Sequence, residues 1–258
     1  MRVFVTGATG FIGSAVVREL IKAGHKVVGL ARSDAAAKSL TAAGAQAHRG
    51  SIEDLDSLRR GRRDPHGLLS RVLAGEYLDA PSSDVRRESE RYRLEIMGAA
   101  VETDRRAIET LGAALAGPDR SLVVTFPTMA LARGRLATEK DAPDPNSAGG
   151  LRAPSEEATM AMASRGVRAS VVRLPPHAVA EEGMPVREIA EVIGRRLTVP
   201  VVTKSRKEAA GLFGFIAPFL PVDNPVSSAL TQELLGWRPA HPRLIPDLEK
   251  VTISTSGR

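Results

Sequence analysis

The sequence lacks cysteine altogether, and its 258 residues include only two tyrosines, one tryptophan and 3% aromatic residues. Without cysteine, disulfide bonds, cysteine-ligated zinc and cysteine nucleophiles are excluded. The five histidines are scattered without paired ligand spacing, so we expect no metal site. So few aromatic rings argue against base-stacking platforms. We therefore expect no nucleic-acid partner, although the net charge is +6.

The sequence also lacks a long hydrophobic run. The longest apolar stretch, residues 209–222, is interrupted by Pro218 and Pro221, and it is shorter than the roughly 20 residues that a membrane-spanning helix needs. Glycines stand near the N-terminus where the apolar core of a signal peptide would lie. We therefore expect a cytoplasmic protein with no membrane partner.

Short apolar strands alternate with amphipathic helices along the first 60 residues. Strands are expected at 2–6, 26–31 and 45–48, and helices at 11–23, 34–42 and 52–60. Gly24 and Gly44 are natural stops for the first two helices. This alternation predicts βαβ units around a parallel sheet. The fold class is therefore α/β, a doubly wound Rossmann-type sheet.

Residues 61–97 interrupt this alternation. A fourth strand is due there, but the segment is rich in Arg, Asp, Glu and Ser and has no period-2 pattern. We interpret it as an irregular insert in which the strand is missing. The pattern then returns. Helices are expected at 101–115, 155–164, 185–197, from 205 and at 228–235, and strands at 122–125, 169–174, 177–180 and 199–202. A long loop is expected at 127–150. The sequence therefore predicts three parts, a Rossmann domain over 1–176, a small C-terminal lobe over 177–250 and a frayed tail over 251–258.

A glycine-rich turn joins the first strand to the first helix. It reads Thr6-Gly7-Ala8-Thr9-Gly10-Phe11-Ile12-Gly13. Gly7 permits the tight turn, Gly10 lets the backbone approach a pyrophosphate, and Gly13 lets the helix pack close to the strand. The N-terminus of the helix presents unpaired N–H groups to the anion. The predicted cofactor-binding residues of this turn are Gly7, Thr9, Gly10, Phe11, Ile12 and Gly13.

The end of the second strand bears on the choice of cofactor. NAD-binding proteins place an acidic residue there for the ribose hydroxyls, but this chain reads Ala31-Arg32-Ser33. Arg32 would pair with a 2′-phosphate, and Ser33 could donate a hydrogen bond to it. Asp34 is expected to cap the next helix. The sequence favours NADP over NAD; the alternative is that Arg32 is only a surface residue.

The GxxGxxG spacing, and TGATGFIG itself, resembles the extended and atypical short-chain dehydrogenase/reductases, the NAD-dependent epimerase/dehydratase family. Residues 50–54 resemble the family's adenine-side loop, which implies that Ser51 and Ile52 bind the cofactor. Residues 170–176 resemble its sixth strand, and residues 185–190 and 234–239 resemble its C-terminal lobe. The resemblance implies an NAD(P)-dependent oxidoreductase acting on a small-molecule carbonyl or alcohol.

The family's catalytic pattern is absent from this chain. The family uses a tyrosine proton donor in YxxxK and a Ser or Thr after the fifth strand, but neither tyrosine here begins a YxxxK. By alignment Arg152 occupies the tyrosine position and Glu156 the lysine position, and an arginine cannot donate its proton at neutral pH. Thr125 and Thr128 remain as catalytic candidates for polarising a carbonyl. The alternative is that both hydroxyls bind loop backbone.

The C-terminal lobe is shorter than the family pattern implies. The family has several dozen residues between a Pro-Pro such as that at 175–176 and a strand such as 177–180, and here the two adjoin. Those residues carry much of the substrate pocket, so the sequence does not identify the substrate. Three functions stay open: an oxidoreductase whose proton comes from another group, a non-catalytic NAD(P)-binding sensor or partner module, and a compromised variant. A homodimer is compatible with each.

Overall fold

The chain forms two units. The computed structural model describes residues 1–61, 67–70, 90–117, 120–175, 185–213, 217, 220–240 and 243–250. One unit comprises Met1–Phe126 with Leu151–Arg173, and the other comprises Pro127–Gly150 with Leu174–Arg258. The loop at 127–150 thus belongs to the second unit, whereas the boundary expected at residue 176 assigns it to the Rossmann domain.

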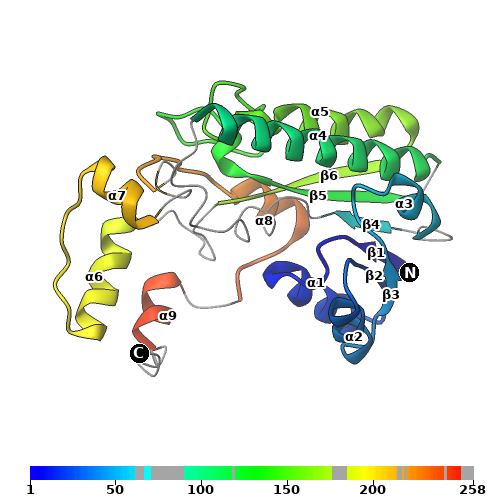
Figure 1. The fold of residues 1–258 in the computed structure, drawn as a ribbon, viewed down its shortest axis with the longest axis horizontal. Helices are drawn as coiled ribbons and strands as arrows, with labels where there is room; N and C mark the ends of the chain where they lie inside the picture. The colour runs from blue at the N-terminus through cyan, green and yellow to red at the C-terminus, as the bar shows by residue number, and fades with distance from the viewer. Residues whose placement is uncertain are drawn as a thin grey trace. The chain divides into compact units, whose positions relative to one another are not determined.

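A six-stranded sheet in the order β3-β2-β1-β4-β5-β6 forms the centre of the first unit (Figure 1). The strands are β1 Arg2–Val5, β2 Lys26–Ala31, β3 Gln46–Arg49, β4 Gly67–Ser70, β5 Ser121–Pro127 and β6 Arg168–Leu174. The pairs from β3 to β5 are parallel. From β1 the chain runs first to β2 and β3 and then to β4, so the direction of winding reverses between β1 and β4. This confirms the predicted doubly wound fold, in which ligands bind at such a switch point.

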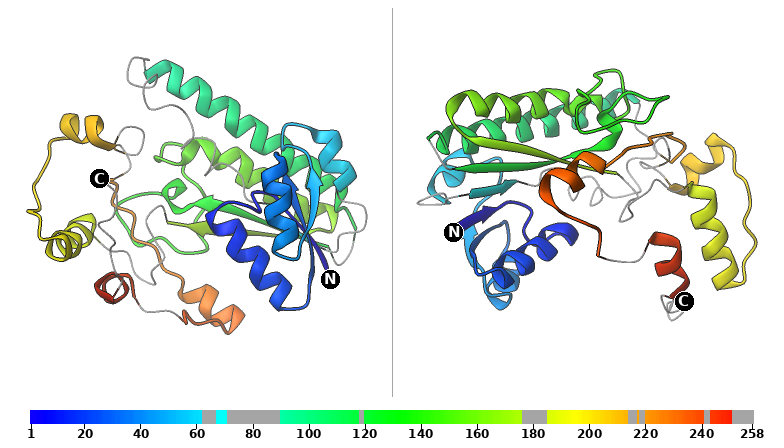
Figure 2. Two further views of the ribbon diagram at one scale, coloured as in Figure 1. Left: turned by 60° about the horizontal axis from the view of Figure 1, so that its bottom comes forward. Right: turned by 180° about the vertical axis from the view of Figure 1, so that it is seen from behind.

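Helices cover both faces of this sheet. In the views of Figures 1 and 2, α1 and α2 lie on one face, and α3, α4 and α5 lie on the other. Their bounds are α1 Phe11–Lys22, α2 Asp34–Ala42, α3 Leu55–Gly61, α4 Glu90–Ala114 and α5 Ala153–Ala161. Single 3-10 turns, Gly150–Arg152 and Met162–Arg165, flank α5. The strand and helix ends predicted for the first 45 residues agree with these bounds to within one residue.

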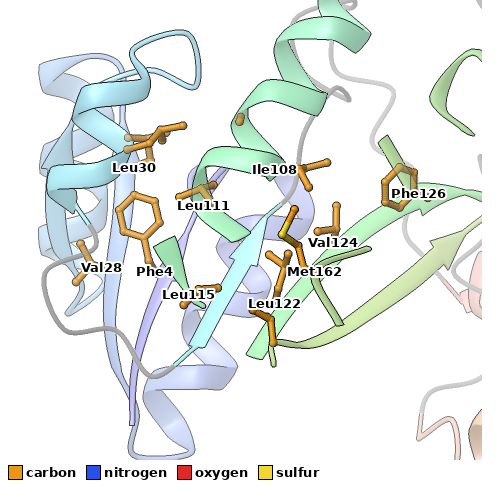
Figure 3. Close-up of a cluster of buried hydrophobic side chains, with 13 residues drawn as sticks. Phe4, Val28, Leu30, Ile108, Leu111, Leu115, Leu122, Val124, Phe126 and Met162 are labelled. Atoms are coloured by element: carbon orange, nitrogen blue, oxygen red, sulfur yellow. The ribbon is translucent and has the colours of Figure 1, made fainter. Parts of the chain in front are cut away.

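Each face of the sheet buries its own hydrophobic cluster. Successive side chains of a strand point to opposite faces, so Phe4 enters one cluster, and Val3 and Val5 enter the other. Figure 3 shows the cluster under α4, whose labelled side chains are Phe4, Val28, Leu30, Ile108, Leu111, Leu115, Leu122, Val124, Phe126 and Met162. Ile108 and Leu111 form the buried face of α4, and Leu115, the residue after its end, is fully buried with them.

The fourth strand corrects the expectation for residues 61–97. The segment is not irregular throughout, because β4 lies between β1 and β5 and the first turns of α4 also fall within it. In the parallel ladder Leu68 lies opposite Phe4 on one side and Leu122 on the other. A strand flanked by two others gains its order from their backbone hydrogen bonds, which a four-residue sequence pattern does not reveal. Residues 62–66 and 71–89 lie outside the described part of the chain, and Gly61 is the last residue of α3.

The second unit carries four of the described helices. They are α6 Val186–Leu197, α7 Arg206–Phe213, α8 Ala229–Leu235 and α9 Leu244–Lys250. A capping box begins α7, since the Glu208 N–H donates to Ser205 Oγ at 3.3 Å and the Ser205 N–H donates to Glu208 Oε2 at 2.9 Å. The sequence did not predict α9, whose Glu249 Oε1 lies 3.5 Å from Arg195 Nη2 on α6.

The strand expected at 199–202 is wrong. These residues form no regular element, and the segment folds back on α6 so closely that a Cβ at Gly194 would lie 2.5 Å from Val201 Cγ2. A β-branched run becomes a strand only where another strand can pair with it, and none of the described strands pairs with this one. The strand expected at 177–180 and the tail expected at 251–258 lie outside the described residues. Among the helices that the structure describes, none is both long and apolar enough to cross a membrane.

Several contacts join the 127–150 segment to the chain after residue 224. The Ala137 N–H donates to the Pro225 carbonyl at 3.0 Å, and the Ala137 carbonyl accepts from the Ser227 N–H at 2.9 Å. Glu139 Oε1 accepts from both the N–H and the hydroxyl of Thr231, each at 2.7 Å. The segment is therefore held by residues about 90 positions later in the chain.

Replacing Leu111 by Ala should lower the free energy of unfolding by about 2–5 kcal/mol, because its fully buried side chain would leave a cavity under α4. Met160→Ala on α5 is the control, since that side chain is 49% exposed and should cost about 1 kcal/mol or less. Urea unfolding measures both. Equal losses in the two variants would contradict the assignment of Leu111 to the core.

Candidate functional site

The glycine-rich turn lies between β1 and α1, at the switch point of the sheet. Gly7 has a φ of +61°, in the left-handed region, and its carbonyl accepts from the Gly10 N–H at 3.1 Å. A Cβ at Gly13 would lie 1.9 Å from the Gly7 carbonyl oxygen, so no larger residue fits where α1 passes the turn. Gly7 and Gly13 are therefore required by the geometry of the turn itself.

Gly10 is different, because the turn alone does not require a glycine there. It is the N-cap residue of α1, with φ −75° and ψ 171°, a conformation open to any residue. No side chain caps the helix, and its first turn holds no acidic residue. Phe11 and Thr9 are exposed beside it, and Ile12 is half-buried. The N–H groups of the first turn and the positive end of the helix dipole are thus available to an anion.

The end of β2 lies next to this turn in the sheet. Arg32 and Ser33 follow β2, and both are exposed. Ser33 Oγ accepts from the Ala36 N–H at 3.1 Å, so Ser33 caps α2, and the prediction that Asp34 does so is wrong. The reason is that Ser33 has extended backbone, as a cap requires, while Asp34 is already helical. Capping uses only the acceptor side of the Ser33 hydroxyl, whose proton remains available for donation.

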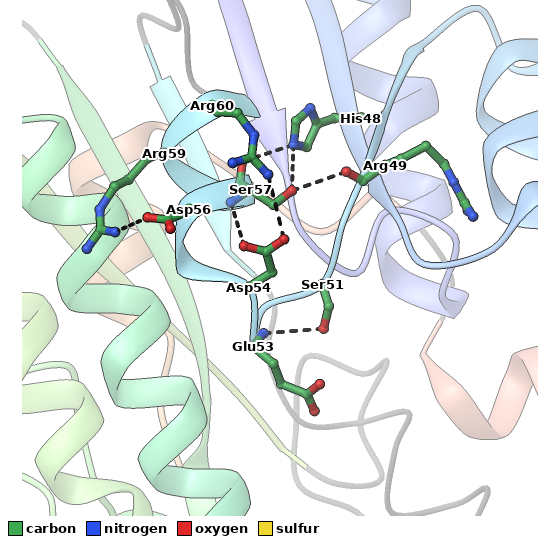
Figure 4. A network of polar contacts seen from close by, with 9 residues as sticks. All are labelled: His48, Arg49, Ser51, Glu53, Asp54, Asp56, Ser57, Arg59 and Arg60. Carbon is green, nitrogen blue, oxygen red and sulfur yellow. Dashed lines mark hydrogen bonds and ion pairs between the residues drawn. The ribbon is translucent and has the colours of Figure 1, made fainter.

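The loop over residues 50–54 follows β3, beside the end of β2. Ile52 packs on the cluster under α3 and α4, and Ser51 Oγ accepts from the Glu53 N–H at 3.3 Å. Asp54 Oδ1 accepts from the Ser57 N–H at 2.8 Å and so caps α3 (Figure 4). This cap is why the helix begins at Leu55 and not at residue 52, as the sequence predicts.

Thr125 and Thr128 are placed differently. Thr125 is half-buried on β5. Thr128 opens the 3-10 turn Thr128–Ala130 and is 3% exposed. The side-chain amide of Asn224 is oriented so that both its oxygen and its nitrogen have partners. The oxygen accepts from the Thr128 hydroxyl at 2.7 Å and from the Met129 N–H at 3.2 Å, and the nitrogen donates to the Thr128 carbonyl at 3.2 Å. The Thr128 hydroxyl therefore binds loop structure, and its proton is already donated.

The first of the two positions aligned with YxxxK holds a buried ion pair. Arg152 Nη2 lies 2.7 Å from Asp104 Oδ2, and the Asp104 side chain is fully buried. The guanidinium carbon lies 4.5 Å from the centroid of the Phe126 ring, and Nη1 donates to the Thr125 carbonyl at 3.4 Å. Burial raises the pKa of Asp104, and Arg152 opposes that rise. The pair thus links α4, β5 and the start of α5.

The second position holds another ion pair. Glu156 is 4% exposed, and both of its carboxylate oxygens face the guanidinium of Arg173 on β6, with Nε donating to Oε2 at 3.4 Å and Nη2 donating to Oε1. Arg152 and Glu156 are therefore both engaged in charge pairing. Sequence reasoning missed Asp104, although its spacing from Ile108 places it on the buried face of α4. No cluster of metal-ligating side chains occurs in the described part of the chain.

Comparisons with known proteins agree with this fold. The model of the NAD dependent epimerase/dehydratase family matches residues 3–69. An uncharacterized protein of Schizosaccharomyces pombe is 37% identical over 96% of this chain and 98% of its own length. Its alignment spans 309 positions, whereas 96% of 258 residues is about 248, so about 60 positions face gaps in this chain. A deficit of several dozen residues is also what the sequence predicts for the C-terminal lobe.

Two solved structures share the fold along nearly the whole chain. UDP-glucose 4-epimerase from Thermotoga maritima, determined with UDP-glucose, is 18% identical, with a TM-score of 0.62 and 96% of both chains covered. UDP-glucose 4-epimerase from Thermus thermophilus, determined with NAD, is 19% identical, with a TM-score of 0.60, covering 98% of this chain and all of that one. At such identities the likeness shows the fold alone.

Replacing Arg152 by Met should cost about 3–5 kcal/mol of unfolding free energy at pH 7, because it leaves the Asp104 carboxylate buried without a cation. Burial raises the folded-state pKa of that carboxyl above its unfolded value, so protonation favours the folded variant. Its stability relative to the wild type should therefore recover as pH falls from 7 to 5.

Arg105→Met on the same helix is the control, since Arg105 pairs with the more exposed Glu102 and Glu109. It should cost much less than Arg152→Met, because solvent screens exposed ion pairs. Arg105 lowers the pKa of Glu102, so the stability that this pair adds is present above the ordinary pKa of a glutamate and is lost only as the pH falls below it. The difference from the wild type should therefore change little between pH 7 and pH 5. Urea unfolding at pH 7 and pH 5 measures these differences, and a pH-independent loss in Arg152→Met would contradict the account of Asp104.

Proposed function

Because this chain belongs to the NAD-dependent epimerase/dehydratase family, we propose that it binds a nicotinamide dinucleotide at the turn between β1 and α1. The observation that carries the proposal is Gly10. Its backbone conformation is open to any residue, and no side chain caps the helix that it begins. A glycine at that place is explained by a ligand that needs the space of a side chain, and a pyrophosphate satisfies the N–H groups of the helix.

The bound cofactor is NADP in preference to NAD. Arg32 stands at the end of β2, where an acid would otherwise bind the ribose hydroxyls, and a guanidinium pairs with a phosphate in two hydrogen bonds. Ser33 can donate its hydroxyl proton to the same phosphate while it caps α2. The nearest acid, Asp34, faces Arg49, with its carboxylate 3.3 Å from the guanidinium. That cation offsets the repulsion that Asp34 would exert on a 2′-phosphate.

The activity is an oxidoreduction of a small-molecule carbonyl or alcohol, in which the dinucleotide supplies or accepts the hydride. The protein's own part is to bind and orient the cofactor. The proton does not come from Arg152 or Glu156, since both are held in ion pairs. Thr125 remains the hydroxyl that could polarise a carbonyl, whereas the Thr128 hydroxyl already donates its proton to Asn224.

A second candidate is a non-catalytic protein that binds NADP as a sensor or partner module. The two ion pairs favour it, because they replace the proton-donating pair of the family with groups that only pair charges. A titration of NADPH fluorescence on the purified protein, followed by NADPH oxidation with a panel of aldehydes and ketones, separates the candidates. Binding with turnover supports the enzyme, and binding without turnover supports the sensor. Binding of neither NADPH nor NADH refutes both and leaves a compromised variant.

Gly10→Val should abolish dinucleotide binding and leave the fold intact, because the branched side chain fills the proposed pyrophosphate site while the backbone at Gly10 accepts it. Gly98→Val on α4 is the matched control, since a Cβ there meets no atom within 4 Å. Gly13→Ala should instead unfold the turn, because the new Cβ would lie 1.9 Å from the Gly7 oxygen. Binding by Gly10→Val equal to that of the wild type would refute the phosphate site.

Arg32→Ala should weaken NADPH binding by roughly tenfold and leave NADH nearly unchanged, since an exposed charge pair with phosphate is partly screened by solvent. Arg32→Asp should invert the preference, because a carboxylate repels the 2′-phosphate but accepts hydrogen bonds from ribose hydroxyls. The measurement is a pair of dissociation constants for each variant at fixed salt. Equal losses for both cofactors would show that Arg32 serves only the fold.

A further inference from the structure

Ser57 ties together the two ends of the loop that follows β3. Its hydroxyl donates to the Arg49 carbonyl at 3.1 Å, and its N–H donates to Asp54 Oδ1 at 2.8 Å. The residue is 1% exposed. Residues 50–53 lie between these two attachment points, so one buried serine fixes both the start and the end of the loop (Figure 4).

Gly50 allows the Ser57 hydroxyl to come this close. A Cβ at Gly50 would lie 2.0 Å from Ser57 Oγ, and the Gly50 N–H donates to the Ala31 carbonyl at 3.1 Å. The backbone at this point is therefore held between the end of β2 and the serine. The loop starts next to Arg32, the residue to which we assign the 2′-phosphate.

His48 supports Ser57 from the adjoining strand. Its Nε2 lies 3.0 Å from the Ser57 carbonyl oxygen and 3.0 Å from the hydroxyl oxygen. The carbonyl can only accept, and the hydroxyl proton is donated to Arg49, so Nε2 carries a proton and donates to both oxygens. The ring lies edge-on to Phe4 with centroids 5.9 Å apart, and a Cβ at Gly61 would come within 2.8 Å of it. The histidine is thus held by packing as well as by hydrogen bonds.

We propose that Ser57 and His48 are positioning residues for the adenosine half of the dinucleotide. They act through the loop backbone, which they hold in one conformation before the cofactor arrives, with Ser51 and Ile52 between the two points at which Ser57 holds the loop. A loop ordered in advance does not have to lose conformational freedom on binding, and this raises affinity. The inference rests on the proposed function, because only that function assigns the loop to adenosine.

The test compares ligands that represent the two halves of the cofactor. The probes are 2′,5′-ADP and 5′-AMP for the adenosine half and nicotinamide mononucleotide for the other half, with dissociation constants from calorimetry. Ser57→Ala and His48→Leu should each weaken the adenosine nucleotides by roughly five- to tenfold and leave nicotinamide mononucleotide unchanged. His48→Gln should stay within about twofold of the wild type, because its amide N–H can replace Nε2–H.

Thr159→Val is the control for a general loss of stability. Thr159 is fully buried on α5 and donates to the Ser155 carbonyl at 2.9 Å, so its removal costs a comparable hydrogen bond away from the loop. It should leave adenosine affinity unchanged. Weakened binding in Thr159→Val, or a His48→Gln variant as weak as His48→Leu, would overturn the positioning role.

The outcomes also separate this inference from the function on which it rests. If the wild type binds none of the probes and neither NADPH nor NADH, the proposed function fails, and the inference fails with it. If the wild type binds them and Ser57→Ala and His48→Leu bind equally well, only the positioning role is refuted. Should Ser57→Ala fail to fold, the two His48 variants decide the matter by themselves.

Discussion

The close approach of α1 to the end of β1 is the constraint on which the rest of the site depends. With only 1.9 Å between the Gly7 oxygen and the place of a Gly13 Cβ, the helix can start here only because residue 13 has no side chain. This approach brings the first turn of α1 to the point where the order of the strands reverses. The ends of β2 and β3, at Arg32 and Gly50, follow next to it in the order of the strands. The absence of a side chain at residue 13 thereby sets the positions of the other proposed cofactor-binding residues.

Much of this arrangement could be predicted from the sequence, because the N-terminal elements carry strong local signals. The run at 26–31 is apolar after Lys26, and the helix at 11–22 has clear periodicity and a glycine after its end. β4 could not be predicted, since its four residues depend on the strands on either side. The cap of α2 was misplaced by one residue, because Ser33 and Asp34 are both good caps and only the backbone angle decides between them.

The ion pairs on α5 could not be predicted for another reason. Arg152 and Glu156 are charged residues that in most helices face solvent, and only their distant partners, Asp104 and Arg173, make their burial tolerable. The alignment located both positions but not their partners, which lie on α4 and β6. A missing YxxxK could be recognised from the sequence, whereas what fills its place is a property of the packed interior. The absence of a pattern does not reveal the structure that replaces it.

The ties between the 127–150 segment and the residues after 224 also bear on how the protein is made. During synthesis the ribosome releases residues 127–150 well before Pro225, Ser227 and Thr231, which supply their hydrogen bonds. At the usual rate of translation this delay is on the order of 5–20 s. Through that interval the 127–150 segment, which lies between β5 and α5 in the sequence, has none of these three hydrogen-bonding partners.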